Sequence, residues 1–281
     1  MAACDILSDR SIDHYDFLRG IGDGSHGEVY LGKHKETGEE VAIKLGRERR
    51  TDVLYEAKVY RALQGEGART DEFSDVKHYG IQWNGDAESR AYIIMGLLGP
   101  NLEELFDFCS NSFHRKTVLM LADQLITRLE YVHSKGYVHC SVKPENFATG
   151  IGKKVNQVHI IDFCKARRCC NAETGTHNPY RDTRLGYMLM YYLRGSLPWQ
   201  KGYLGLNTKQ MTERLRSKML ATDIDSLCSG FPEEFAEYLK YCRCLRFDEQ
   251  PDYSLLRLKR DGRYTWILVA QSLGIAAKDK G

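Results

Sequence analysis

The sequence predicts an α+β fold in two parts, a small part with an antiparallel sheet and a larger part that is mainly helical. Short apolar segments with strand-like alternation follow one another up to residue 98. Beyond Gly99 and Pro100, apolar residues recur instead at three- and four-residue steps, as in amphipathic helices. At 281 residues the chain is long enough for two packed parts with substantial cores.

The first part is predicted to be a series of strands with one helix among them. The strands cover residues 15–22, 28–34, 40–45, 76–83 and 91–98. Residues 53–64 have helical spacing, and this helix stops at Gly65. In the second part, residues 116–134 and 231–242 carry the apolar stripe of amphipathic helices.

Composition and charge exclude several classes of protein. With 42% hydrophobic and 28% charged residues the chain resembles an ordinary soluble protein, and its net charge of +2 indicates no nucleic-acid partner. No apolar run reaches about 18 residues, so no transmembrane segment is expected. The first residues lack the basic and apolar regions of a signal peptide. We therefore expect a cytoplasmic or nuclear location.

The nine cysteines indicate neither a disulfide framework nor a structural zinc site. Their number is odd and no C-x-x-C pair occurs. The adjacent Cys169 and Cys170, and the pair Cys242 and Cys244, fit structural zinc spacing poorly. Without a secretory signal, reduced thiols are expected.

A glycine motif lies between the first two predicted strands. Gly22, Gly24, Gly27 and Val29 match G-x-G-x-x-G-x-V. The pattern alone is weak, but a dinucleotide fingerprint opens a helix, whereas this motif joins two strands. Glycines there allow bare backbone amides to approach phosphate oxygens. We expect His26, at the tip of this loop, to be solvated rather than a ligand or base.

Lys44 and Glu56 are predicted to form an ion pair. Lys44 ends the segment Val-Ala-Ile-Lys on the next strand, and Glu56 lies on the following helix. A lone Lys–Glu pair is usually a surface feature. The order of glycine loop, strand lysine and helix glutamate favours phosphate binding instead.

Residues 137–146 resemble a protein-kinase catalytic loop, His-Arg-Asp-x-x-x-x-Asn. His139, Lys143 and Asn146 stand at the expected offsets, but Ser141 occupies the position of the catalytic Asp. The resemblance implies Lys143, Asn146 and Ser141, which replaces the general base, as the catalytic residues. Further on, Asp162 begins a segment similar to Asp-Phe-Gly, in which the Asp holds magnesium. The resemblance implies a bilobal protein-kinase fold, with Asn146 and Asp162 as metal ligands.

Longer segments resemble the casein kinase I family of serine/threonine kinases. These segments are residues 97–109, 116–124, 130–135, 143–147, 159–163, 195–200, 231–239 and 251–253. The resemblance implies a monomeric, magnesium- and ATP-dependent kinase acting on acidic or already phosphorylated protein segments. It also implies Met95 as the gatekeeper and Leu98 in the hinge over adenine. The implied ATP-binding residues are Ile21, Gly22, Gly24, Gly27, Val29, Ala42, Lys44, Glu56, Met95, Leu98 and Ala148.

Three substitutions depart from this family pattern. Ser141 lacks the basicity of the catalytic Asp, whose general-base help is worth about 10²–10⁴-fold. Cys164 replaces the glycine after Asp162 and Phe163. If that position needs a conformation that only glycine adopts easily, the Cβ costs about 1–2 kcal/mol. Ala148 replaces a leucine beneath the adenine, which should weaken nucleotide packing.

The largest departure is a shortened activation segment. Residues 177–181 run almost directly into the apolar residues 185–192, so the expected platform for a peptide substrate is missing. Arg181 stands where the family has an anchoring acid, with Asp182 one position away. The chain is either a degenerate paralogue or the product of a gene model that skips coding segments.

The predicted domain organisation follows from the strand and helix pattern and from the resemblance. Residues 1–14 are an N-terminal extension, 15–96 the small lobe, 97–266 a truncated large lobe and 267–281 a tail. The leading hypothesis is a pseudokinase that binds ATP and protein partners, with impaired phosphotransfer to Ser or Thr. The alternatives are an active serine/threonine kinase and a non-functional product that folds poorly.

Overall fold

The computed structural model describes most of the chain. It covers residues 11–24, 26–47, 52–65, 73–84, 88–169, 183–200, 208–246, 249–256, 259–260 and 263–264. The predicted tail at 267–281, most of the N-terminal extension and the shortened segment with Arg181 and Asp182 lie outside these residues.

The described residues form two compact units, and the predicted α+β class is confirmed. The first, which we call the sheet unit, comprises residues 1–102, 134–141 and 145–167. The second, the helical unit, comprises residues 103–133, 142–144 and 168–281. Each unit combines segments that are distant in sequence. The predicted boundary between two lobes after residue 96 stays a prediction.

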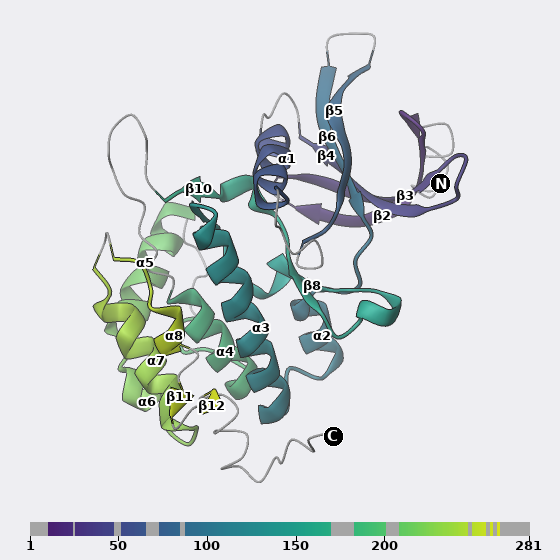
Figure 1. The fold of residues 1–281 in the computed structure, drawn as a ribbon. Coiled ribbons are helices and arrows are strands. Elements are labelled where there is room, and N and C mark those ends of the chain that lie inside the picture. Colours follow the sequence, from purple (N-terminus) through teal and green to yellow (C-terminus); the bar gives the residue numbers. More distant parts are fainter. Residues whose placement is uncertain are drawn as a thin grey trace. The chain divides into compact units, whose positions relative to one another are not determined.

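An antiparallel six-stranded sheet dominates the sheet unit, with strand order β1-β2-β3-β4-β6-β5 (Figure 1). Its strands are β1 (Ser11–Ile12), β2 (Tyr15–Gly24), β3 (Gly27–His34), β4 (Glu40–Gly46), β5 (Val76–Asn84) and β6 (Glu88–Gly96). The strand β2 is longer than predicted, because it continues through the glycine motif to the hairpin with β3. The other predicted strands are confirmed to within a few residues.

Strand alternation separates the two faces of this sheet. Val41, Ile43 and Leu45 point to one face and pack in an apolar cluster with residues of β1, β2 and β6. Because successive side chains of a strand point to opposite faces, Ala42 and Lys44 belong to the other face. The apolar cluster stabilises one face of the sheet, and the opposite face carries Lys44.

Helix α1 (Asp52–Leu63) packs against the sheet, contacting β4, β5 and β6 (Figure 1). Asp52 lies in its first turn and Arg61 in its last, where each complements the helix dipole. Short elements complete this region of the chain. They are β7 (Tyr137–Val138), β8 (Phe147–Thr149), β9 (Val158–Ile160), β10 (Arg167–Arg168) and single 3-10 turns at Pro144–Asn146, Gly152–Lys154 and Phe163–Lys165.

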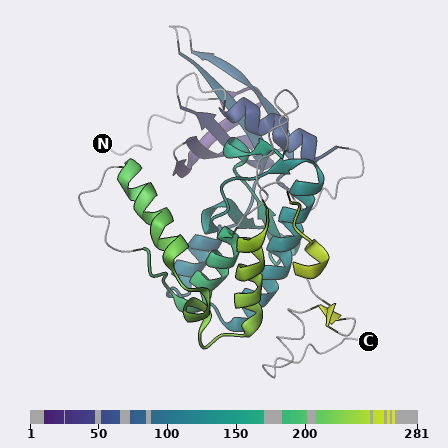
Figure 2. The ribbon, with the colours of Figure 1, turned by 90° about the vertical axis from the view of Figure 1, so that its left-hand side faces the viewer.

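Helices make up most of the helical unit (Figures 1 and 2). Their bounds are α2 (Leu102–Phe108), α3 (Arg115–Ser134), α4 (Arg184–Arg194), α5 (Thr208–Ala221), α6 (Ile224–Cys228), α7 (Glu233–Cys244) and α8 (Tyr253–Leu256), with a short hairpin of β11 (Lys259–Arg260) and β12 (Arg263–Tyr264). The two predicted helices correspond to α3 and α7. The helix α7 begins later than predicted because Pro232 occupies its N-cap. In the described part of the chain, no helix has both the length and the apolar character for a membrane crossing.

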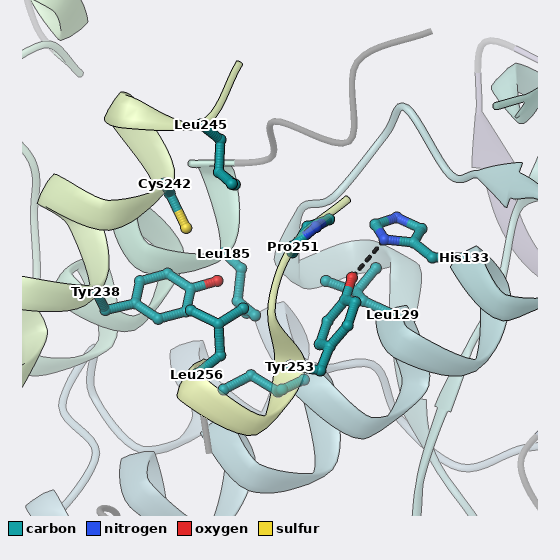
Figure 3. Close-up of a pocket in the computed structure, with 10 residues that line it drawn as sticks. Leu129, His133, Leu185, Tyr238, Cys242, Leu245, Pro251, Tyr253 and Leu256 are labelled. Carbon is teal, nitrogen blue, oxygen red and sulfur yellow. Dashed lines mark hydrogen bonds between the residues drawn. The ribbon is translucent and has the colours of Figure 1, made fainter. Parts of the chain in front are cut away.

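A pocket in the helical unit is lined by side chains of α3, α4, α7 and α8 (Figure 3). Leu129, Leu185, Cys242 and Leu256 supply apolar walls. Its polar pair is the buried Tyr253 hydroxyl, hydrogen-bonded to Nδ1 of His133. This hydrogen bond links α8 to the end of α3.

The close contact of α4 with α7 requires a glycine. A Cβ on Gly186 would lie 2.5 Å from Cδ2 of Leu239 and 3.0 Å from Cδ1 of Tyr238. We predict that Gly186→Val lowers the free energy of unfolding by about 1–3 kcal/mol through overpacking, measured by urea denaturation.

Gly20→Val is the matched control, because no atom lies within 4 Å of the Cβ that it adds to strand β2. This control is expected to change stability little. Equal effects of the two variants would contradict the assignment of Gly186 to a close helix contact.

Candidate active site

A buried lysine holds three segments of the sheet unit together. Nζ of Lys44 on β4 lies 2.7 Å from Oε2 of Glu56 on α1. The same ammonium lies 3.0 Å from Oδ1 of Asp162, just after β9. Lys44 and Glu56 are both buried, at 7% and 1% exposure. The predicted Lys44–Glu56 pair is therefore present, and it is internal rather than a surface feature.

The charges in this cluster stabilise one another. Burial by itself would lower the pKa of Lys44, but neighbouring groups, with Glu56 foremost, raise it well above its ordinary value. Burial would likewise raise the pKa of Asp162, but the Lys44 ammonium lowers it to about 2. At neutral pH Lys44 is therefore an ammonium and Asp162 a carboxylate.

Cys164 belongs to the same cluster. Its Sγ donates to Oε2 of Glu56 at 3.0 Å and accepts from Nζ of Lys44 at 3.4 Å. Burial, and next the Glu56 carboxylate, raise the pKa of this thiol. The thiol is thus held in its neutral form and completes the hydrogen bonding around Lys44.

The sequence predicts backbone strain at Cys164 if its position needs a glycine conformation, and the structure does not show that conformation there. Cys164 lies in a 3-10 turn and is absent from the described residues with positive φ, whereas Asp162 has φ 63° and ψ 70°. Asp tolerates this left-handed conformation better than most residues. The left-handed backbone conformation is therefore at Asp162, whose carboxylate bonds to Lys44.

The glycine motif forms the β2–β3 hairpin. Gly22 pairs with Val29 and Gly24 with Gly27. A Cβ on Gly27, whose φ is +153°, would lie 2.1 Å from the carbonyl oxygen of Leu45, so only glycine fits. The expected solvation of His26 is wrong, because its side chain is only 14% exposed and its Nδ1 lies 4.0 Å from Oδ2 of Asp162.

Register brings most of the predicted nucleotide residues to one face of the sheet. Lys44 pairs with Val29, Ala42 pairs with Met95, and directly opposed side chains share a face. Gly22 joins them through its pairing with Val29. Ile21 lies at an irregularity of the β2–β3 register, between Gly20 and Gly22. The resulting surface has bare backbone at the hairpin and a lysine beside it.

Backbone hydrogen bonds hold the segment after β6, which includes Leu98, beside the strand that carries Ala148. The Gly99 amide donates to the carbonyl of Thr149, and the Thr149 amide donates to the carbonyl of Pro100. Ala148 is buried and Leu98 half-buried. A Cβ on Gly99 would lie 2.7 Å from Oγ1 of Thr149, so this close approach also needs glycine.

Asn146 is bonded to the residue at the position of the catalytic base. Its Nδ2 donates to the carbonyl oxygen of Ser141 at 2.8 Å and to Oγ of Ser141 at 3.2 Å. The backbone carbonyl of Asn146 accepts from the Ile161 amide, adjacent in sequence to Asp162. Lys143 is exposed and belongs to the helical unit, so its catalytic role stays a prediction.

The sequence analysis missed an aromatic stack beneath these residues. The ring of Phe163 meets Tyr60 at 4.9 Å and His139 at 4.9 Å, both edge-on. His139 is fully buried and lies 3.0 Å from the carbonyl of Ile161 through Nε2. A signal for Tyr60 was present, because it follows Glu56 by four residues and shares its helix face.

The donors present fit magnesium. Asp162 offers a carboxylate, and the amide of Asn146, whose nitrogen is turned to Ser141, leaves its oxygen for a cation. Carboxylate and amide oxygens are the ligands that a hard cation prefers. A nucleotide with magnesium would thus be held by hairpin amides, Lys44 and these oxygens.

The chain also matches a protein-family model. A model described as the protein kinase domain matches residues 15–188, which is more than half of the chain. The matched segment includes the hairpin, Lys44, Glu56, Ser141, Asn146 and Asp162.

We predict that the Lys44–Glu56 pair shows the energetics of a buried ion pair. Lys44→Met leaves buried carboxylates without their cation and should cost about 3–5 kcal/mol in unfolding free energy. Adding Glu56→Gln removes one of those charges, so the double variant should be more stable than the sum of the single effects predicts, by about 0.5–3 kcal/mol. Urea denaturation of all four proteins measures this.

The control is the exposed pair formed by Lys77 and Glu39, which are 3.0 Å apart. Its single and double variants, Lys77→Met and Glu39→Gln, should each change stability by less than about 1 kcal/mol. Additive effects at Lys44 and Glu56 would show that the two residues are not coupled.

Proposed function

The chain belongs to the protein kinase domain family, and on this premise we propose that it is a casein-kinase-I-like protein that binds ATP with magnesium but transfers phosphate poorly. In this proposal it acts as a pseudokinase or binding module for protein partners. The observation that carries the proposal is the combination of an intact Lys44–Glu56–Asp162 cluster with Ser141 at the position of the base.

Nucleotide binding is supported by the groups that the glycine hairpin and one face of the sheet present together. Gly22, Gly24 and Gly27 carry no side chains, so the hairpin backbone at these three positions can approach a phosphate closely. Lys44, already buried and charged, can balance phosphate oxygens. The apolar Val29, Ala42 and Met95 on the same face suit an aromatic base.

Magnesium and ATP are the cofactors that kinase domains generally use, and bound together they supply a transferable phosphoryl group. In this chain Asp162 and Asn146 are the proposed ligands of the cation. The lowered pKa of Asp162 keeps its carboxylate ionised and suited to a cation near neutral pH. Ala148 in place of a leucine is expected to weaken the affinity for adenine.

Impaired transfer is inferred from Ser141. A serine hydroxyl is a poor proton acceptor near neutral pH, so general-base help worth about 10²–10⁴-fold is lost. Its Oγ already accepts from Asn146. Ser141 therefore keeps the loop ordered through hydrogen bonds without supplying the basicity of the carboxylate that it replaces.

The finer identity rests on the resemblance to casein kinase I. It includes a shortened activation segment, which lies among residues outside the described part of the chain. We propose a monomer in the cytoplasm or nucleus that engages acidic or phosphorylated protein segments, or the partners of its active relatives.

A second candidate function, an active serine/threonine kinase, is favoured by one specific observation. The buried ion pair of Lys44 with Glu56, at 2.7 Å, is one that an active kinase requires. Positioning and metal electrostatics would then sustain transfer without the base.

We predict that magnesium-ATP raises the thermal unfolding midpoint of the wild-type protein, because a ligand that binds only the folded state stabilises it. At about 100 times the dissociation constant the gain is about 2.7 kcal/mol. Lys44→Met should abolish the shift, because it removes the cation nearest the phosphates. Differential scanning fluorimetry over an ATP titration measures both.

Lys35→Met is the matched control for this titration. Lys35 is 42% exposed and pairs with Asp16 of β2, so its loss should leave the ATP shift unchanged. Absence of any shift at millimolar ATP, in protein that unfolds cooperatively, would overturn the nucleotide proposal.

We predict that Ser141→Asp alone recovers little phosphotransfer. Positioning of the substrate accounts for up to about 7–11 kcal/mol of such barriers, more than one proton acceptor supplies. A family-like activation segment grafted between Cys170 and Leu185 in the Ser141→Asp variant should raise the rate further. A radiolabelled transfer assay on an acidic protein substrate compares these proteins.

Asp162→Ala in the wild-type background is the control for contaminating kinases. Robust transfer by the wild-type chain that Asp162→Ala abolishes would establish the active-kinase alternative. Full recovery by Ser141→Asp without the graft would show that the base alone limits turnover.

A further inference from the structure

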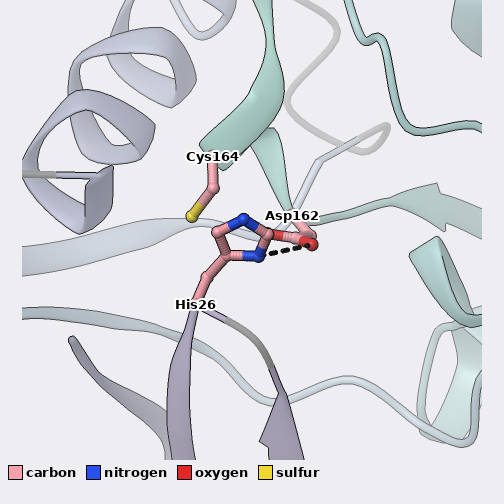
Figure 4. Close-up of side chains that lie close together, drawn as sticks. All are labelled: His26, Asp162 and Cys164. Carbon is pink, nitrogen blue, oxygen red and sulfur yellow. Dashed lines mark ion pairs between the residues drawn. The ribbon is translucent and has the colours of Figure 1, made fainter. Parts of the chain in front are cut away.

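The proposed nucleotide site gives His26 and Cys164 no contact with the nucleotide or with magnesium, yet both side chains converge on Asp162. One ligand atom from each of the three residues lies within 4.8 Å of the other two. Figure 4 shows the His26 ring, from the β2–β3 hairpin, facing Asp162 and Cys164 from the segment after β9. All three residues belong to the sheet unit and are half-buried.

The donor set differs in kind from a magnesium site. Imidazole nitrogen, thiolate sulfur and carboxylate oxygen are the three ligand types of zinc in proteins, whereas magnesium prefers oxygen alone. Soft sulfur ligands in particular select zinc and similar transition metals. A site with three protein ligands also leaves a fourth position for water.

We propose that His26, Asp162 and Cys164 form a binding site for a borderline divalent transition metal such as Zn²⁺. This inference needs neither ATP binding nor phosphotransfer. It assigns a role to the cysteine that stands in place of the family's glycine and to a histidine that sequence analysis treated as solvated.

The three ligand atoms need to approach one another only slightly to coordinate a zinc ion. Zinc–ligand bonds of about 2.0–2.3 Å place tetrahedral ligands about 3.3–3.7 Å apart. The present separation of His26 Nδ1 and Asp162 Oδ2 is 4.0 Å. Movements of about 1 Å or less, within reach of side-chain rotation, therefore convert the cluster into a coordination shell.

Lys44 and the metal ion would compete for the same donors. The Lys44 ammonium now lies 3.0 Å from Asp162 and 3.4 Å from the sulfur of Cys164. Positive charges at such distances repel strongly away from water. Metal binding thus separates Lys44 from Asp162 and leaves it paired with Glu56. The thiol proton, now donated to Glu56, is released to solvent when the thiolate binds the metal.

Cobalt(II) provides a direct test, because a bound thiolate gives a sulfur-to-cobalt charge-transfer band and tetrahedral coordination gives intense visible bands. The full-length protein, purified with a chelator and then dialysed, is titrated with Co²⁺, and Zn²⁺ affinity follows from displacement of the cobalt spectrum. The variants are Cys164→Ser and His26→Gln. Circular dichroism and the thermal midpoint verify that each variant is folded.

The chain offers matched controls for both variants. Cys109 and His114 are exposed and lie in the helical unit, so Cys109→Ser and His114→Gln remove the same donor types elsewhere. Cys169→Ser tests the adjacent Cys169 and Cys170, which could bind cobalt adventitiously.

The expected result is loss of the charge-transfer band in Cys164→Ser and loss of the tetrahedral spectrum in His26→Gln. Zinc affinity should fall by about 100-fold or more in each, since loss of an outer partner of a ligand already costs about 10–100-fold. The controls should bind as the wild type does. The proposal is overturned if folded wild-type protein gives no band at saturating cobalt, if either variant keeps full affinity, or if Cys169→Ser abolishes the band.

Discussion

The buried charge of Lys44 constrains the whole sheet unit. An ammonium at 7% exposure is stable only where carboxylates offset the cost of its desolvation. Glu56 on α1 is one such carboxylate. Asp162 is the other, and it lies 118 positions after Lys44 in the chain. The sheet, the helix and the turn after β9 must therefore be assembled together. Separation of α1 from the sheet would leave the buried Glu56 without its cation.

Asp162 is held by its backbone as well as by its charge. Its left-handed conformation turns the carboxylate to Lys44 and sets Phe163 into the stack with Tyr60 and His139. The Phe163 amide also donates to Oε1 of Glu56 at 3.1 Å. One residue of unusual φ thus joins the polar cluster to the aromatic packing behind it. Cys164 lies in the following 3-10 turn, outside the left-handed region, and carries its Cβ without that strain.

Hydrogen bonds hold the loop of residues 139–146 around Ser141. His139 lies within hydrogen-bonding distance of the Ser141 amide and the Ile161 carbonyl, and Asn146 bonds Ser141 on the other side. These contacts involve backbone groups that any residue supplies. A serine at position 141 is therefore compatible with this set of hydrogen bonds.

The sequence by itself determined the features that depend on local periodicity and spacing. Strand alternation predicted the sheet, three- and four-residue steps predicted α3 and α7, and the order of Gly22, Lys44 and Glu56 predicted the ion pair. Only the tertiary structure decided where His26 points, that Asp162 rather than Cys164 takes the left-handed conformation, and that Cys164 joins Lys44. These features arise from contacts across more than a hundred positions, for example 120 between Lys44 and Cys164. Such contacts depend on backbone rotations and packing that no local pattern encodes.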